Sequence, residues 1–241
     1  MPLPKLNTIT YQLVLPSTDQ TITYRPFTVE EEKILLTAQE STESKDILQA
    51  MRQIVNNCVQ TPIDVMKLAT FDLEYFFLNI RAKSTGEEIE LLLKHRNSTN
   101  SNGQVCEHKQ IMKISIDEVK VHKSENHQNR FQLDENVGVQ LRYPTFEAMA
   151  YTNNNDEFEQ LIELIANSIE MIYDKDGVYN AEDSTIDELR KFVYSMNQKQ
   201  IAMIQEFFET MPVLKHEVAY KCTECGCLEN VEIRGFQNFF L

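Results

Sequence analysis

Glycine is scarce in this chain, and the catalytic motifs that depend on it are missing. Only six glycines occur in 241 residues. The sequence contains no Gly-rich phosphate loop, no Gly-x-Ser-x-Gly elbow and no His-Glu-x-x-His pair. Its five histidines are scattered, and we expect all of them except His108 to be solvated side chains rather than catalytic bases. These absences favour a protein that is not an enzyme and has no small-molecule substrate.

Positive charge is also in short supply. Lysine and arginine total 23 against 37 aspartates and glutamates, which gives a formal net charge of -14. Phosphate backbones and anionic lipid surfaces are repelled by such a chain, so nucleic acid is not an expected partner. The charge suits docking onto basic protein surfaces, although a solvated acidic surface without a partner is the simpler alternative.

Long apolar runs are absent. Stretches such as residues 76–80 and 201–204 are far shorter than a membrane span, and the N-terminal residues lack the apolar core of a signal peptide. We therefore expect a protein that stays inside the cell. The hydrophobic fraction of 42%, with 13 phenylalanines and 9 tyrosines, is too high for wholesale disorder.

The first third of the sequence predicts a hairpin followed by helices. Two short runs at 11–15 and 22–25, rich in Thr, Val, Ile, Leu and Tyr, are typical of paired strands. Thr28 and Glu31 form a capping-box pattern at the start of a helix. A second helix runs from Ser44 until Thr61-Pro62 stops it, with Cys58 on its apolar face. We expect Asp72 to cap a third, very apolar helix.

The rest of the sequence alternates strand-like and helical patterns. Strands are predicted at 88–93 and 112–116 as a long-looped hairpin, at 137–143, at 215–220 and at 230–234. Helices are predicted at 158–172, from Ser184 or Thr185, and at 197–210, whereas the polar stretch 122–130 is expected to be mobile.

These patterns predict an α+β fold: a mostly helical body with small antiparallel β hairpins. We expect four parts: an N-terminal hairpin plus helical unit at 1–86, a β region at 87–144, a helical unit at 145–213, and a C-terminal cysteine hairpin at 214–241 that packs back on 87–144.

Three of the five cysteines lie close together, in Cys222-Thr223-Glu224-Cys225-Gly226-Cys227. Two thiolates three residues apart can bind one metal ion from a tight turn, and Gly226 supplies the backbone freedom of that turn. Two more ligands are available at another expected hairpin tip, which carries Cys106 and His108. Two tips that share one ion have the geometry of a zinc ribbon, so we expect structural zinc held by Cys106, His108, Cys222 and Cys225.

Other readings of the cysteines remain open. Cys227 is an alternative fourth ligand, and a site reduced to three ligands would hold no metal. In a third interpretation, all of these cysteines are free thiols in a reducing compartment and bind no metal. A redox role is disfavoured because such motifs start a helix after a strand, whereas this turn lies between two strands.

The C-terminal residues are conspicuously apolar. The simpler interpretation is a tail packed on the body of the protein, and the functional one is an exposed anchor for a partner groove, with these partner-binding residues: Phe236, Phe239, Phe240 and Leu241. The N-terminal arm, residues 1–6, presents the same choice.

A different protein class fits part of this pattern: a zinc-ribbon adaptor or regulator that docks on transcription machinery. It would need a basic face on the ribbon. The sequence offers only a small basic face of this kind, made of Lys109, Lys113, Lys215, Lys221 and Arg234.

Several segments resemble the baseplate protein family of T-even-type contractile-tailed bacteriophages. The resemblance is carried by Tyr24-Arg25-Pro26-Phe27 with Glu31-Glu32-Lys33, by residues 79–84, and by the cysteine turn with its Phe239-Phe240 end. It implies a non-enzymatic baseplate hub component or hub-assembly factor that binds other hub and tail proteins. It also implies a location in the host cytoplasm during assembly or in the tail baseplate of the virion.

Overall fold

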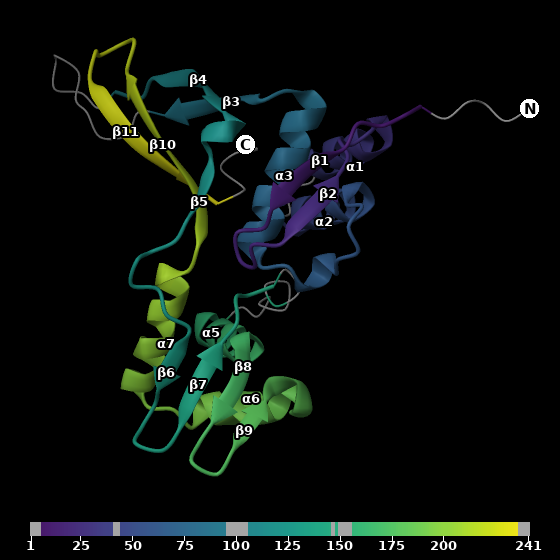
Figure 1. The fold of residues 1–241 in the computed structure, drawn as a ribbon. Helices are drawn as coiled ribbons and strands as arrows, with labels where there is room; N and C mark the ends of the chain where they lie inside the picture. The colour runs from purple at the N-terminus through teal and green to yellow at the C-terminus, as the bar shows by residue number, and fades with distance from the viewer. Residues whose placement is uncertain (1–5, 41–43, 95–105, 146–147, 149–155, 236–241) are drawn as a thin grey trace, which may run out of the picture. The chain divides into compact units, whose positions relative to one another are not determined.

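A computed structural model describes residues 6–40, 44–94, 106–145, 148 and 156–235 (Figure 1). The chain forms two compact units. The first comprises residues 1–63, 71–122 and 213–241, and the second comprises residues 64–70 and 123–212. Both consist of helices and small antiparallel sheets, which confirms the α+β class. The four-part domain division stays a prediction, and the two units group its parts differently.

The first unit begins with a hairpin and a set of helices. Strands β1 (Tyr11–Val14) and β2 (Thr21–Tyr24) pair antiparallel. Helices α1 (Val29–Gln39), α2 (Ser44–Cys58) and α3 (Thr70–Thr85) follow. The capping box predicted for α1 is present, since the carboxylate of Glu31 accepts hydrogen bonds from the backbone N–H and the hydroxyl of Thr28.

Large apolar side chains from these elements are buried together. The rings of Tyr24 and Phe76 meet edge to face with centroids 5.4 Å apart. Cys58 is fully buried, as the helical pattern of α2 predicts. The prediction that Asp72 caps α3 is wrong: the helix begins two residues earlier, and Asp72 instead accepts hydrogen bonds from Ser17 in the turn after β1.

Two small sheets complete the first unit. β3 (Glu88–Lys94) pairs with β4 (Lys109–Ser115). β10 (Val213–Lys221) pairs with β11 (Leu228–Arg234) on one side and with β5 (Lys120–His122) on the other. A short 3-10 turn at Ile116–Glu118 links β4 to β5. The buried faces of both sheets and of α3 form one apolar cluster: Leu78, Ala82, Ile89, Leu91, Ile114, Ile116, Val119, Leu214, Val218, Tyr220 and Ile233.

The second unit is built around an antiparallel sheet in the order β6-β7-β8-β9. Figure 1 shows helices α5, α6 and α7 gathered around it. The strands are β6 (Arg130–Gln132), β7 (Gly138–Leu141), β8 (Ile169–Tyr173) and β9 (Val178–Asn180). The helices are α5 (Glu157–Ser168), α6 (Ile186–Tyr194) and α7 (Gln198–Thr210), and 3-10 turns lie at Val65–Lys67 and Ala181–Asp183.

One prediction for these segments is wrong. The helix expected over 158–172 ends at Ser168, and the chain continues as β8 because residues 169–173 hydrogen-bond to β7 and β9. The polar stretch 122–130 begins in β5 and ends in β6, and its mobility stays a prediction. None of the described helices combines the length and apolar character that a membrane crossing requires.

Candidate metal centre

Three cysteine thiols meet in the first unit. The sulfur atoms of Cys106, Cys222 and Cys225 all lie within 4.8 Å of one another. The Sγ atoms of Cys106 and Cys222 are 3.9 Å apart, although 116 positions separate the two residues in sequence. Two thiolates on one tetrahedral zinc are about 3.8 Å apart for a Zn–S bond of about 2.3 Å. The spacing therefore suits two ligands of one ion, and the cluster could hold a metal.

The turn after β10 supplies two of these thiols. The backbone N–H of Cys222 donates to the carbonyl of Cys227, and the N–H of Gly226 donates back to the carbonyl of Cys222, both at 2.9 Å. Gly226 has a φ of +73°, a left-handed conformation that a side chain disfavours. These bonds close the turn tightly and bring Cys222 and Cys225 to one side of it.

The third thiol, that of Cys106, belongs to the β3–β4 hairpin. It lies near the other two because the β3–β4 sheet and the β5–β10–β11 sheet share an apolar core. Side chains alternate along each strand, so Ile89 and Leu91 of β3 face the same cluster as Val218 and Tyr220 of β10. Cys106 lies three residues before β4 and Cys222 directly after β10. Both are at least 95% buried, with exposed fractions of 5% and 2%, and Cys225 is half-buried.

The predicted ligands His108 and Cys227 lie beside the thiols but outside the cluster. His108 Nε2 is 3.0 Å from the hydroxyl of Thr223. Gln110 Oε1 accepts a hydrogen bond from the backbone N–H of Thr223 at 3.1 Å. These contacts join the two hairpin tips directly. Cys227 is half-buried, and its carbonyl, rather than its thiol, has a defined role in the turn.

The surroundings of Cys106 favour its protonated form when no cation is bound. The backbone N–H of His108 lowers the pKa of Cys106, but burial and the neighbouring Cys225 and Cys222 outweigh it, so the pKa is raised. Burial is also the main reason that the pKa of Tyr220 is raised. A raised thiol pKa disfavours a reactive nucleophile. All five cysteines lie in the described residues, and none forms a disulfide.

Two of the five residues in the basic face that a transcription adaptor would need lie beside carboxylates. Lys113 lies 3.6 Å from Glu88 and 3.5 Å from Glu90. Lys215 lies 3.2 Å from Glu232 and 3.5 Å from Glu217. These pairs contribute little stability, but Lys113 and Lys215 are each matched by two carboxylates. The arrangement does not favour binding to a phosphate backbone.

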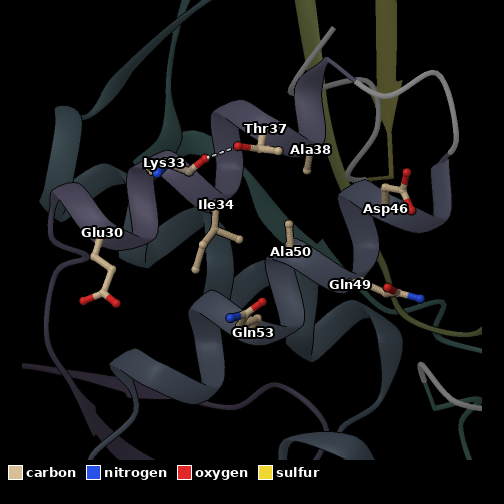
Figure 2. A pocket seen from close by; sticks show the side chains of 9 residues that line it. All are labelled: Glu30, Lys33, Ile34, Thr37, Ala38, Asp46, Gln49, Ala50 and Gln53. Carbon is tan, nitrogen blue, oxygen red and sulfur yellow. Dashed lines mark hydrogen bonds between the residues drawn. The ribbon is translucent and has the colours of Figure 1, made fainter.

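A groove between α1 and α2 is a separate concave feature of the first unit (Figure 2). Its volume is about 630 Å³. Ile34, Ala38 and Ala50 form its apolar part, and the remaining lining residues are Glu30, Lys33, Thr37, Asp46, Gln49 and Gln53. The hydroxyl of Thr37 is held by the carbonyl of Lys33 at 2.8 Å. These side chains include no histidine or cysteine, and they do not form a catalytic arrangement.

Sequence patterns identified the three thiols but not the residues around them. Tyr220, Thr223 and Gln110 were not singled out, although the alternating pattern of β10 does place Tyr220 on the same face as Cys222. The predicted partner anchor, Phe236, Phe239, Phe240 and Leu241, lies outside the described residues.

Comparison with known families decides the class of the protein. A family model described as T4 bacteriophage base plate protein matches residues 7–241. The chain belongs to this family. The resemblance seen in the sequence is thereby confirmed: the chain is a T4-type phage base plate protein. No curated protein and no solved structure matches the chain.

Proposed function

We propose that the chain is a non-enzymatic component or assembly factor of the base plate hub and acts by binding other hub and tail proteins. The family match over residues 7–241 carries this proposal. It is supported by the strongly acidic composition, with a net charge of -14, and by the lack of a catalytic arrangement among the described residues. The protein would meet its partners in the host cytoplasm while the contractile tail assembles.

The cysteine cluster has a structural role in this proposal. Zinc would be bound by Cys106, Cys222 and Cys225, with His108 as the fourth ligand and Cys227 as the alternative. His108 is the better candidate because its contact with Thr223 keeps it at the same pair of hairpin tips. The ion would join β3–β4 to β10–β11 and make this part of the first unit rigid.

A rigid body with apolar ends suits a docking protein. Phe236, Phe239, Phe240 and Leu241 would bind in a groove of a partner, since aromatic anchors supply much of the energy of protein interfaces. The acidic surface would contribute to the rate and specificity of association with basic neighbours.

Co-purification tests the proposal. The full chain, carrying an affinity tag, is co-expressed with the other base plate hub and tail proteins of the same phage. We expect at least one of them to be retained at moderate salt. A chain with Phe239→Ala and Phe240→Ala should retain less of it. Recovery of no tail protein under any of these conditions would contradict the proposed function.

The role of zinc is tested separately by the metal content of the purified chain. Cys106→Ser, Cys222→Ser and Cys225→Ser should each release the ion, and His108→Ala should weaken its binding. Cys227→Ser is the matched control within the same turn. Loss of metal in Cys227→Ser but not in His108→Ala would assign the fourth position to Cys227.

A further inference from the structure

Two aromatic rings in the second unit enclose the side chain of His127. The ring of Tyr143 stacks on the imidazole with centroids 5.5 Å apart and an angle of 18° between the planes. The ring of Phe207 in α7 lies 5.1 Å from the imidazole. The sequence predicted a solvated side chain, but the Nε2 atom is fully buried and has no hydrogen-bond partner among the described residues. The other nitrogen, Nδ1, lies 3.0 Å from the hydroxyl oxygen of Thr210, the last residue of α7.

The hydrogen bonds of Thr210 determine which imidazole nitrogen carries the proton. The hydroxyl has a single proton to donate, and its oxygen lies 2.7 Å from the backbone carbonyl of Glu206. When the hydroxyl donates to this carbonyl, its oxygen accepts from Nδ1–H of His127, and both bonds are made. The other neutral tautomer would lose one of these bonds and bury an unpaired N–H at Nε2. The neutral imidazole therefore carries its proton on Nδ1 and a lone pair on Nε2.

A second proton on His127 would disturb this arrangement. It would bind to Nε2, where the new N–H is buried without an acceptor and the positive charge is removed from water. Burial is the main reason that the pKa of His127 is lowered, and the charge of Lys123 lowers it further. The unfolded chain, with a pKa of 6.5, therefore binds this proton more readily than the folded protein. Acid should weaken the contacts of His127.

The charged side chains closest in sequence to these contacts do not stabilise a protonated Nε2. All of them are exposed: Lys123, Glu125, Arg142, Glu206 and Glu209. None accepts a hydrogen bond from Nε2. The remaining titratable neighbour is Tyr143, which contacts the imidazole through its ring.

The contact between His127 and Thr210 joins two segments that are 83 positions apart in sequence. His127 follows β5, in the stretch where the chain enters the main segment of the second unit. Thr210 precedes β10, where the chain leaves that segment. The backbone N–H of His127 also donates to the carbonyl of Ser124 at 3.2 Å. A single side chain thus connects the entering stretch to the end of α7.

We propose that the contact between His127 and Thr210 is an acid-sensitive link that holds residues 123–129 on the end of α7. At neutral pH Nδ1 donates to Thr210 and the link is intact. Protonation of Nε2 weakens the link and frees residues 123–129 from the helix. The link lies entirely in the second unit, so it is independent of the cysteine cluster and of the proposed function.

The tautomer is tested by NMR on the full chain. Long-range proton–nitrogen correlation spectra at pH 7.5 distinguish the two neutral forms of each histidine. The signals of His127 are assigned as those missing in His127→Phe. They should show a protonated Nδ1 and an unprotonated Nε2. The opposite form would overturn the proposal.

Hydrogen exchange, corrected for the intrinsic effect of pH, tests the acid sensitivity. Between pH 7.5 and pH 5.5, the amide of His127 and those of the last turn of α7 should lose protection, by at most about tenfold for each pH unit below 6.5. In His127→Phe, which keeps an aromatic ring between Tyr143 and Phe207, acid should not reduce protection. His122→Phe is the matched control, since His122 is exposed on β5, and it should behave like the wild type.

The contrary results are equally definite. Unchanged or higher protection at pH 5.5 would overturn the proposal, because the two rings would then hold the imidazolium as well as the neutral form. An equal loss in wild type and His127→Phe would assign the effect to another group. If His127→Phe does not fold, Thr210→Val replaces it. This variant lacks the acceptor and should show lower protection of the His127 amide already at pH 7.5, whereas wild-type protection would overturn the link.

Discussion

Glu31 is a buried carboxylate that links the start of α1 to Arg25. Its side chain is 4% exposed and lies 2.8 Å from the guanidinium of Arg25, while Thr28 donates to its second oxygen. The hydrogen bond from Arg25 is the main reason that the pKa of Glu31 is lowered to about 2. Glu31→Gln should destabilise the protein by about 2 kcal/mol at pH 7, less than the full shift implies, because water partly reaches Arg25.

The dependence of this effect on pH follows from the sign of the shift. Because the pKa of Glu31 is lower in the folded protein than in the unfolded chain, the ionised carboxylate stabilises the fold fully above the unfolded value of about 4.5. This stabilisation decreases as the pH falls toward 2. Urea unfolding should therefore show a difference between wild type and Glu31→Gln at pH 7 that shrinks near pH 3. Glu30→Gln, an exposed change on the same helix, is the control. An equal difference at both pH values would contradict this account.

Asp72 should show the opposite dependence. It is fully buried, and burial raises its pKa to about 6 although Ser17 donates two hydrogen bonds to it. A raised native pKa means that its contribution is complete below about 3.8 and is lost as pH rises through 6. Asp72→Asn should remove this loss, which amounts to about 2–3 kcal/mol between pH 4 and pH 7.

Urea unfolding of wild type and Asp72→Asn at several pH values tests this prediction. Wild type should lose stability between pH 4 and pH 7 relative to Asp72→Asn, which keeps an oxygen that can accept from Ser17. Asp117→Asn, at an exposed aspartate, should leave the profile of the wild type unchanged. Parallel profiles for wild type and Asp72→Asn would show that Asp72 does not titrate in this range.

At the level of elements, the cysteine turn depends on its glycine. Gly226→Ala places a side chain at φ +73°, which costs about 1–2 kcal/mol. Thermal unfolding should show this loss, and metal affinity should fall because the two thiols of the turn are displaced. Gly177→Ala is a suitable control, since a Cβ at Gly177 meets open space and φ is not left-handed. An unchanged Gly226→Ala protein would mean that the turn tolerates the strain.

Local signals in the sequence identified most elements. The Thr28–Glu31 box begins α1 as expected, and α6 follows Thr185, one of its two predicted starts. Such capping interactions form within a single turn of helix. Pairing between distant segments was harder to foresee. β8 continues the apolar pattern of α5, and its strand conformation depends on β7 and β9. β5 is polar, and its pairing with β10 joins residues far apart in sequence.

In the candidate site too, the local turn could be predicted from the sequence, whereas most contacts between distant residues could not. The spacing of Cys222 and Cys225 with Gly226 predicted a turn with two thiols, and that turn is present. The approach of Cys106 could be expected only from the hairpin topology, and the structure places it in the cluster. The contact of His108 with Thr223 depends on packing of side chains, which spacing in sequence does not specify.

At the scale of the whole molecule, the main segment of the second unit is inserted between two paired strands of the first. His122 of β5 and Val213 of β10 are direct register partners, so residues 123–212 leave and re-enter the first unit at adjacent points. The cysteine cluster belongs entirely to the first unit. Metal bound there should stabilise one unit selectively.

Hydrogen exchange tests this selectivity. Removal of zinc by a chelator should raise the exchange rates of amides in β3, β4, β10 and β11, because an ion that joins two hairpins stabilises their native pairing. Amides in β6, β7, β8 and β9 should keep their protection. A uniform rise across both units would contradict a local role for the metal.

The central claim is that two hairpin tips share one metal ion, and native mass spectrometry of the full chain tests it most directly. The account predicts a folded mass that exceeds the denatured mass by one zinc ion, less the protons that the thiols release, and a loss of this difference in Cys106→Ser and Cys222→Ser but not in Cys227→Ser. Equal folded and denatured masses after purification with zinc present would contradict the claim.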